Sequence, residues 1–244
     1  MPDKKTMLVS RAEQLSDPAT RRDFLKIMGI GGAIVFLPTV LTSCKDSTNS
    51  ITGPGTGNTL TIDFSKGDTA VLQFAYALEQ LEADFYTRVV AAFSGFPAAD
   101  QAVLADVQKH EVVHREFLKA ALGATNGFTV TTTYGGLDFT NRTAVLALAA
   151  TFEDLGVAAY NGAAQYITST DNLTIAGKIV SVEARHASAI HDLIAPKTNA
   201  FAPQSFDDAF RPAKVATAAQ AYIVDHLALA NAPSAFVQGP NGNG

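Results

Sequence analysis

Two pairs of glutamate and histidine are the residues of this sequence best suited to chemistry. Glu111 lies three residues before His114, and Glu183 lies three residues before His186. In a helix, such residues project from one face, about 4.5 Å apart along the axis. Both members of a pair can therefore bind one cation, or hold two adjacent ions. Mixed carboxylate and imidazole ligands suit iron or manganese better than metals that prefer thiolate.

Two more glutamates complete a repeated pattern. Glu79 and Glu153 are each followed, seven residues later, by a tyrosine, Tyr86 and Tyr160 respectively. The distance from each glutamate to the glutamate of the next Glu-x-x-His pair is 32 residues in the first half and 30 in the second. A pattern that recurs at nearly constant spacing indicates a duplicated helical hairpin.

These acidic and imidazole side chains occupy the apolar phase of their predicted helices. Over residues 100–123, the stripe that must face inward reads Leu104, Val107, Glu111, His114 and Leu118. Burying an unpaired carboxylate costs several kcal/mol, and four together also repel one another. Two divalent cations would balance four carboxylates. We therefore predict two divalent metal ions, iron or alternatively manganese, bound by Glu79, Glu111, His114, Glu153, Glu183 and His186.

Neighbouring residues are predicted to have lesser roles. Glu82 follows Glu79 by one turn, but its counterpart in the second half is Gly156, so we expect Glu82 at the helix surface or beside the ligands. Tyr86 and Tyr160 either hydrogen-bond the ligands or pack in the core. The alternative for the whole set is that the glutamates form salt bridges on exposed helix faces. Four residues fall outside the apolar stripe and are expected to be solvated: His110, Glu116, His191 and His226.

Helical periodicity predicts an all-α fold. Four segments keep apolar residues three and four positions apart, namely 69–93, 100–123, 141–167 and 173–194, and a weaker fifth covers 212–229. Short connections make each consecutive pair an antiparallel hairpin. The 18 residues 123–140, with a strand-like stretch at 128–134, can run the length of the bundle, and we expect them to start the second hairpin parallel to the first. The prediction is a four-helix bundle with one long crossover and a short fifth helix.

The first 44 residues have the pattern of an export signal. Arg21 and Arg22 precede an apolar run, 27–41, that is too short and too interrupted to span a membrane. The paired arginines followed by this run resemble a twin-arginine export signal. The run ends at Leu41-Thr42-Ser43-Cys44, which resembles a bacterial lipoprotein box. We therefore expect lipidation of Cys44 and an exported protein anchored to a membrane of the cell envelope or periplasm. The alternative is an N-terminal helix with a buried cysteine.

Composition narrows the remaining classes of protein. A net charge of −5 argues against nucleic-acid binding, which needs a basic face. The single cysteine excludes an intramolecular disulfide and a metal site made of thiolates alone. Residues 45–68 are rich in Ser, Thr, Gly and Asn and predict a flexible tether, followed by the bundle over 69–230 and a disordered tail over 231–244.

Two stretches carry a resemblance to a known family. Residues 74–86 (FAYALEQLEADFY) and 153–160 (EDLGVAAY) are similar to helices of the ferritin-like superfamily, more narrowly its exported members grouped with desiccation-related and stress-response proteins. The resemblance covers residues 69–194 and implies a di-iron carboxylate bundle in which the six predicted ligands bind metal. For the activity, our leading hypothesis is oxidation of ferrous iron by O2 or peroxide, as in a ferroxidase or peroxidase. The alternative is a non-catalytic, metal-stabilised bundle that binds an envelope partner. An iron-storage cage suits a tethered chain poorly, and a homo-oligomer is left open.

Overall fold

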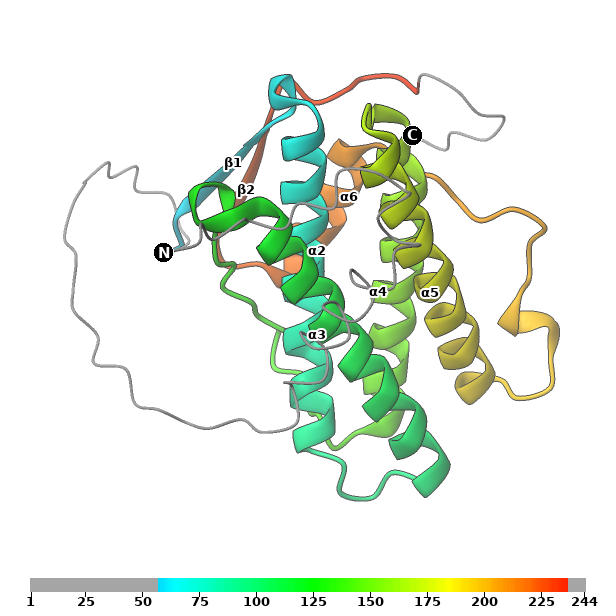
Figure 1. Cartoon of the computed structure of the whole chain (residues 1–244). Coiled ribbons are helices and arrows are strands. Elements are labelled where there is room, and N and C mark those ends of the chain that lie inside the picture. Colours follow the sequence, from blue (N-terminus) through cyan, green and yellow to red (C-terminus); the bar gives the residue numbers. More distant parts are fainter. Residues whose placement is uncertain (1–56, 237–244) are drawn as a thin grey trace, which may run out of the picture. The chain divides into compact units, whose positions relative to one another are not determined.

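The computed structural model describes residues 57–236. Four long helices dominate it: α2 (Asp68–Ala91), α3 (Ala98–Asn126), α4 (Arg142–Ala163) and α5 (Thr170–Ile194). They lie side by side as a bundle (Figure 1). The all-α four-helix prediction is therefore confirmed. The predicted export signal, the lipidation site Cys44 and residues 45–56 of the predicted tether lie outside the described residues.

Side-chain caps and one glycine define several helix ends. The Asn141 side chain accepts a hydrogen bond from the Ala144 N–H (3.1 Å), and that of Ser169 accepts one from the Asn172 N–H (3.3 Å). Both are typical N-caps, which satisfy a backbone donor at the start of a helix. Near the end of α3, Gly123 has φ 65° and kinks the helix. Glycine adopts this left-handed conformation at little cost, and the sequence analysis predicts the end of the helix at this residue.

The long crossover, residues 127–141, runs along the bundle from the end of α3 to the start of α4 (Figure 1). The helix α4 then runs antiparallel to α2, because Tyr86 contacts Glu153 while Glu79 contacts Tyr160. The prediction of a second hairpin parallel to the first is therefore wrong. Since α3 ends where α2 begins, a connection that spans the bundle must place the start of α4 at the opposite end. The strand-like stretch contributes an isolated bridge between Thr132 and Ile223.

Two short strands lie outside the bundle. Strand β1 (Thr59–Asp63) pairs in parallel with β2 (His226–Ala230). Each strand has one buried residue, and these residues, Ile62 and Leu227, belong to the core. Asp225 fixes this corner, because its carboxylate accepts hydrogen bonds from the Asn58 N–H (3.0 Å) and the Thr131 N–H (2.6 Å). The pairing joins segments separated by 167 residues, which local periodicity cannot predict.

These strands correct three sequence predictions. Residues 57–68, expected in a flexible tether, contain β1 and the 3-10 helix η3 (Phe64–Lys66). The fifth helix, expected over 212–229, is only α6 (Pro212–Ala219), followed by the 3-10 helix η6 (Gln220–Tyr222) and β2. In the predicted tail, Asn231 donates a hydrogen bond to Asp63 (2.8 Å), so the start of that segment is placed against β1.

Two further 3-10 helices are η4 (Ala164–Tyr166) and η5 (Asn199–Phe201).

The main core lies between the bundle, the crossover and α6. Phe85, Tyr134, Phe139 and Phe152 pack there with ring centroids 5.0 to 6.2 Å apart.

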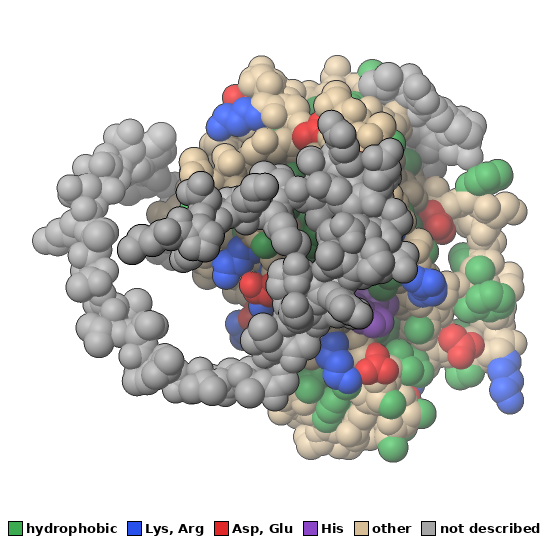
Figure 2. Space-filling model, in the orientation of Figure 1, with side chains coloured by type: hydrophobic (Ala, Val, Ile, Leu, Met, Phe, Trp, Pro, Cys, Tyr) green, Lys and Arg blue, Asp and Glu red, His purple; other side chains and the backbone are tan. Residues whose placement is uncertain are grey.

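Within the described residues, one helical stretch, Arg142–Tyr166, is long and apolar enough to cross a membrane. Most of it is buried against its neighbours, as a core helix of a bundle is. On the face drawn in Figure 2, acidic and basic side chains are interspersed with apolar ones.

Candidate metal centre

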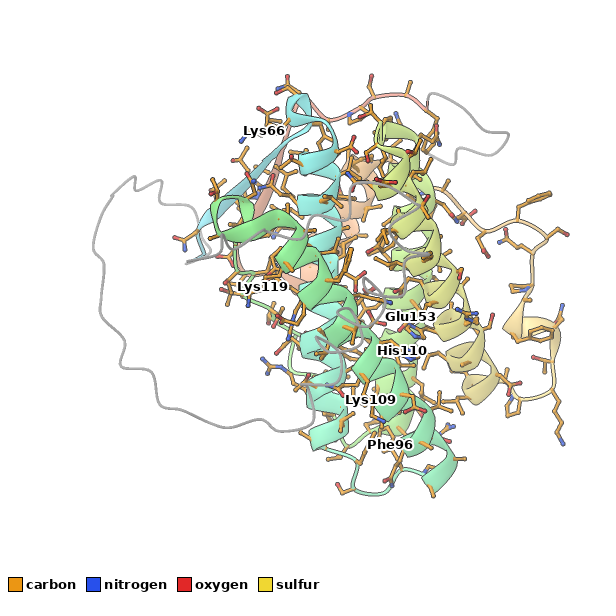
Figure 3. All side chains as sticks on the ribbon, in the orientation of Figure 1. Lys66, Phe96, Lys109, His110, Lys119 and Glu153 are labelled. Carbon is orange, nitrogen blue, oxygen red and sulfur yellow. The ribbon has the colours of Figure 1, made fainter. Side chains whose placement is uncertain are left out.

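All six predicted ligands meet in the middle of the bundle. Each helix supplies one glutamate, and α3 and α5 each add a histidine one turn later. The four glutamates are fully buried, and the two histidines are at most 9% exposed. Figure 3 places Glu153 at mid-height in the bundle. The six residues are Glu79, Glu111, His114, Glu153, Glu183 and His186.

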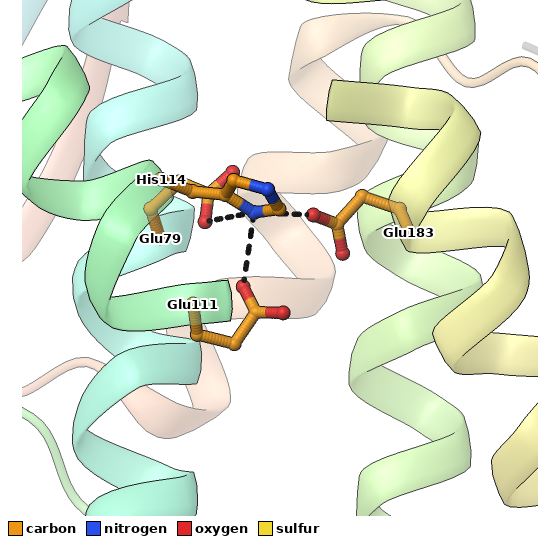
Figure 4. A group of neighbouring side chains, drawn as sticks. All are labelled: Glu79, Glu111, His114 and Glu183. Atoms are coloured by element: carbon orange, nitrogen blue, oxygen red, sulfur yellow. Dashed lines mark ion pairs between the residues drawn. The ribbon is translucent and has the colours of Figure 1, made fainter. Parts of the chain in front are cut away.

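The first ligand group surrounds the Nδ1 atom of His114. This nitrogen lies 2.8 Å from Glu183 Oε1, 3.5 Å from Glu79 Oε2 and 3.6 Å from Glu111 Oε2. Figure 4 shows the three carboxylates arranged around the imidazole. One ligand atom from each residue lies within 4.8 Å of all the others. These four residues can therefore hold one cation.

The second ligand group repeats this geometry around the Nδ1 atom of His186. That nitrogen lies 2.8 Å from Glu111 Oε1, 3.4 Å from Glu153 Oε2 and 3.5 Å from Glu183 Oε2. Glu111 and Glu183 belong to both groups and turn one oxygen toward each imidazole. Two cations bound side by side would thus share two carboxylates and have one glutamate and one histidine each.

Two buried tyrosines orient the unshared glutamates. The Tyr160 hydroxyl donates a hydrogen bond to Glu79 Oε1 (2.5 Å), and the Tyr86 hydroxyl donates one to Glu153 Oε1. Each tyrosine comes from the helix opposite its glutamate. In both cases the other oxygen, Oε2, is left facing the ligand group. Of the two roles considered for these tyrosines, the structure therefore shows the hydrogen bond to a ligand.

The cluster contains polar atoms that the protein itself does not satisfy. Among the described residues, every buried side-chain nitrogen or oxygen without a hydrogen-bond partner belongs to these six residues, eight atoms in all. Each Nδ1 atom lies 2.8 Å from one carboxylate oxygen, so either a proton or a cation at this nitrogen can satisfy the contact. Adjacent ligand atoms on a cation with bonds of about 2.1 Å lie about 3 Å apart. The unsatisfied atoms, with separations of 2.8 to 3.6 Å, therefore fit two bound cations.

Residues 67–196 match the family model described as a ferritin-like domain, which is more than half of the chain. The chain belongs to the ferritin-like domain family. No curated protein matches the sequence. The narrower resemblance to exported, desiccation-related proteins stays a prediction. The buried glutamates and histidines, paired across two hairpins, fit the metal sites of ferritin-like bundles.

The electrostatics of the cluster favour a positive charge at each of the two imidazoles. Burial alone lowers the pKa of His114, but its contacts with Glu111, Glu183 and Glu79 outweigh this and raise the pKa to about 12. The same balance raises the pKa of His186 to about 12. Both imidazoles therefore take up protons unless a cation binds in their place. A cation at either Nδ1 must displace a proton.

Glu82 lies beside the ligands of the ferritin-like domain and not at the helix surface. It is 3% exposed, and a Cβ added to Gly156 would lie 3.1 Å from its Oε1 atom. Gly156 therefore leaves room for the Glu82 carboxylate. Burial, followed by the negative charges of the four ligand glutamates, raises the pKa of Glu82 well above its ordinary value. Glu82 lies outside both four-residue groups, so it is a buried acidic neighbour of the centre and belongs to neither ligand group.

His110 is the residue of the centre that the sequence analysis missed. Its Nδ1 atom lies 2.8 Å from His186 Nε2, and the two rings stack at 12°. His110 is exposed, so it connects a buried ligand to the surface; Figure 3 labels it near Glu153. The corresponding position of the second repeat is Val182, which cannot form a hydrogen bond through its side chain. Only the group around His186 has this support within the described residues.

The other three side chains expected to be solvated lie away from the centre. His191 contacts Asp154 through Nε2 (3.0 Å) near the bundle surface. Glu116 pairs with Arg115 (2.8 Å), and its side chain is 49% exposed. His226 is exposed at the start of β2. Glu116 therefore provides a glutamate on α3 that does not belong to the metal centre.

Proposed function

We propose that this protein is an exported, lipid-anchored member of the ferritin-like domain family whose two-metal centre oxidises ferrous iron. The observation that carries the proposal is the set of eight unsatisfied ligand atoms, divided into two groups that share Glu111 and Glu183. Two shared carboxylates would hold a pair of ions close enough to act together on one oxidant. The physiological role would be protection of the cell envelope from oxidative or drying stress.

Two ferrous ions supply two electrons, one from each ion. When O2 is the oxidant, it takes up both electrons and two protons and leaves as hydrogen peroxide. When peroxide is the oxidant, its O–O bond breaks, and two electrons and two protons convert it to two water molecules. Both reactions leave two ferric ions, so the centre gains two positive charges.

The residues of the chain are suited to stabilise that gain in charge. Four ligand glutamates surround the ions, and Glu82 adds a fifth carboxylate in the same buried space. Tyr86 and Tyr160 hold the outer oxygens of Glu153 and Glu79, which keeps their inner oxygens directed at the centre. Because these groups are fixed in an interior of low dielectric, they stabilise developing positive charge more strongly than water does.

Metal content and turnover test this function together. We expect two metal ions per chain by elemental analysis, and a ferric absorbance band after anaerobic ferrous loading and exposure to O2 or peroxide. Glu183→Gln should lose both the metal and the band, whereas Glu116→Gln should keep both. A protein that binds two metal ions and is unfolded by chelators, but oxidises no iron, would instead be the non-catalytic, metal-stabilised bundle.

The proposed location rests on the sequence motifs alone. Cys44 follows an apolar run preceded by paired arginines, the order found in exported lipoproteins. Cys44→Ser is expected to move the protein from the membrane fraction to the soluble fraction, with its metal content unchanged. Equal membrane association of both forms would refute the lipid anchor but not the metal centre.

A further inference from the structure

A cavity of about 50 Å³ lies between the four bundle helices, at the end where α2 begins. All four helices contribute to its wall, and alanines take up much of it. Alanine side chains on all four helices leave the space between the helices unfilled. Representative lining residues are Ala75, Leu78, Phe117, Tyr160, Ala163 and Ala176.

The wall of the cavity includes a partly exposed residue and a residue in contact with a metal ligand. At its inner end, Tyr160 forms part of the wall and donates the hydrogen bond to Glu79. Leu78, another wall residue, immediately precedes that ligand in α2. Toward the outside, Phe117 lines the cavity and is 37% exposed. One tyrosine side chain therefore separates the cavity from a metal ligand.

The side chains that line the cavity favour the binding of a small apolar molecule. A buried water needs about two to four polar partners, and dry apolar cavities bind ligands such as xenon. The polar side-chain groups of the wall are the Tyr160 hydroxyl and the Asn172 amide. Both are already engaged, the first with Glu79 (2.5 Å) and the second with Asp68 (2.8 Å). The volume leaves room for a few atoms only, which is too little for a lipid chain.

We propose that this cavity binds molecular oxygen and delivers it to the metal centre. The proposal rests on the proposed function and names the oxidant: O2 is small and apolar, and the reaction above consumes it. Hydrogen peroxide carries two hydroxyl groups that need hydrogen bonds, so the cavity disfavours it. Oxidation by O2 should therefore depend on the cavity, and oxidation by peroxide should not.

Xenon provides a test of the cavity that does not depend on turnover. The wild-type protein is expected to bind xenon, seen as a saturable shift in ¹²⁹Xe NMR. Ala163→Val and Ala75→Val, which fill the cavity from different helices, should each abolish this shift. Ala216→Val is the matched control, because Ala216 is buried on α6 and does not line the cavity. An undiminished shift in both cavity variants, or no binding to the wild type, would overturn the proposal.

Stopped-flow oxidation of ferrous-loaded protein tests delivery. In the cavity variants, the rate with O2 should fall severalfold while the rate with peroxide and the number of bound metals stay unchanged. Equal O2 rates in wild type and variants would refute delivery alone. Xenon binding without any oxidation by either oxidant would refute the proposed function, and delivery with it. The two variants guard against misfolding of one, since overpacking costs about 1 to 3 kcal/mol.

Discussion

Glu183 belongs to both ligand groups, whereas Glu153 belongs to one, and this difference can be measured as stability. Glu183→Gln removes one of four ligands from both groups, and Glu153→Gln removes one from a single group. Both substitutions replace a fully buried carboxylate by an amide of similar size. The metal-dependent stabilisation should therefore fall about twice as far in the first variant as in the second.

The expected magnitudes follow from linkage. At a metal concentration about 100 times Kd, each occupied site stabilises the fold by about 2.7 kcal/mol. If loss of a ligand weakens a site by about 100-fold, about 0.4 kcal/mol remains and about 2.3 kcal/mol is lost. For a domain of about 180 residues, 1 kcal/mol corresponds to roughly 3 °C in Tm. Glu153→Gln should thus lose about 7 °C of the metal-induced shift, and Glu183→Gln about 14 °C.

Thermal unfolding with and without Mn²⁺ measures these shifts without redox chemistry. Subtracting the metal-free Tm of each variant removes the direct effect of the amide on the fold. Glu116→Gln, the same substitution at an exposed position of α3, should keep the full wild-type shift. Equal losses in Glu183→Gln and Glu153→Gln would show that Glu183 is not shared. A wild-type shift in Glu183→Gln would refute the assignment of the whole centre.

Three further predictions concern the surroundings of the ligands. His110→Ala should weaken the metal site around His186 by about 10- to 100-fold and leave the other site unchanged. Competition with a chelator measures the two affinities. Two equally weakened sites would contradict the contact between His110 and His186. Binding of Mn²⁺ should release protons and tighten as pH rises from 6 to 8, because the pKa of about 12 keeps His114 and His186 protonated until a cation displaces the proton. Calorimetry in buffers of different ionisation enthalpy measures the number of protons released. Binding without proton release would contradict this prediction. Glu82→Gln should leave two metals bound and raise metal-free stability, because it removes a buried acid whose pKa is raised; loss of one metal would make Glu82 a ligand.

The helical fold and the convergence of the six side chains were predictable because the same helical period indicates both the helices and the residues that face inward. An acidic residue in the apolar phase must point inward wherever the helix packs. Glu82 shows the limit of this reasoning. Its counterpart Gly156 argues against Glu82 as a further ligand but does not decide between the helix surface and a place beside the ligands. In the structure, the absence of a side chain at Gly156 makes the room that Glu82 occupies beside the ligands. A glycine opposite a buried acid is the signal that could have shown this.

His110 and the strands were missed because their partners are distant in sequence. His110 is off the apolar stripe of α3, and only the approach of α5 brings it onto His186. The residues of β2, HLALA, have the alternation of a strand, but the sequence analysis assigns most of them to the end of a helix. Their pairing with β1 depends on Asp225 and the crossover, which local patterns do not reveal.

The parallel pairing of β1 and β2 has a mechanical consequence. These strands lie near the two ends of the described chain and point in the same direction, with five residue pairs in register. Tension applied to those ends would slide the strands lengthwise past each other and load the whole ladder at once. An antiparallel pair pulled open at one end breaks its hydrogen bonds one after another. If the chain is pulled at both ends, the β1–β2 pair therefore bears the force in shear, the direction in which all its hydrogen bonds act together.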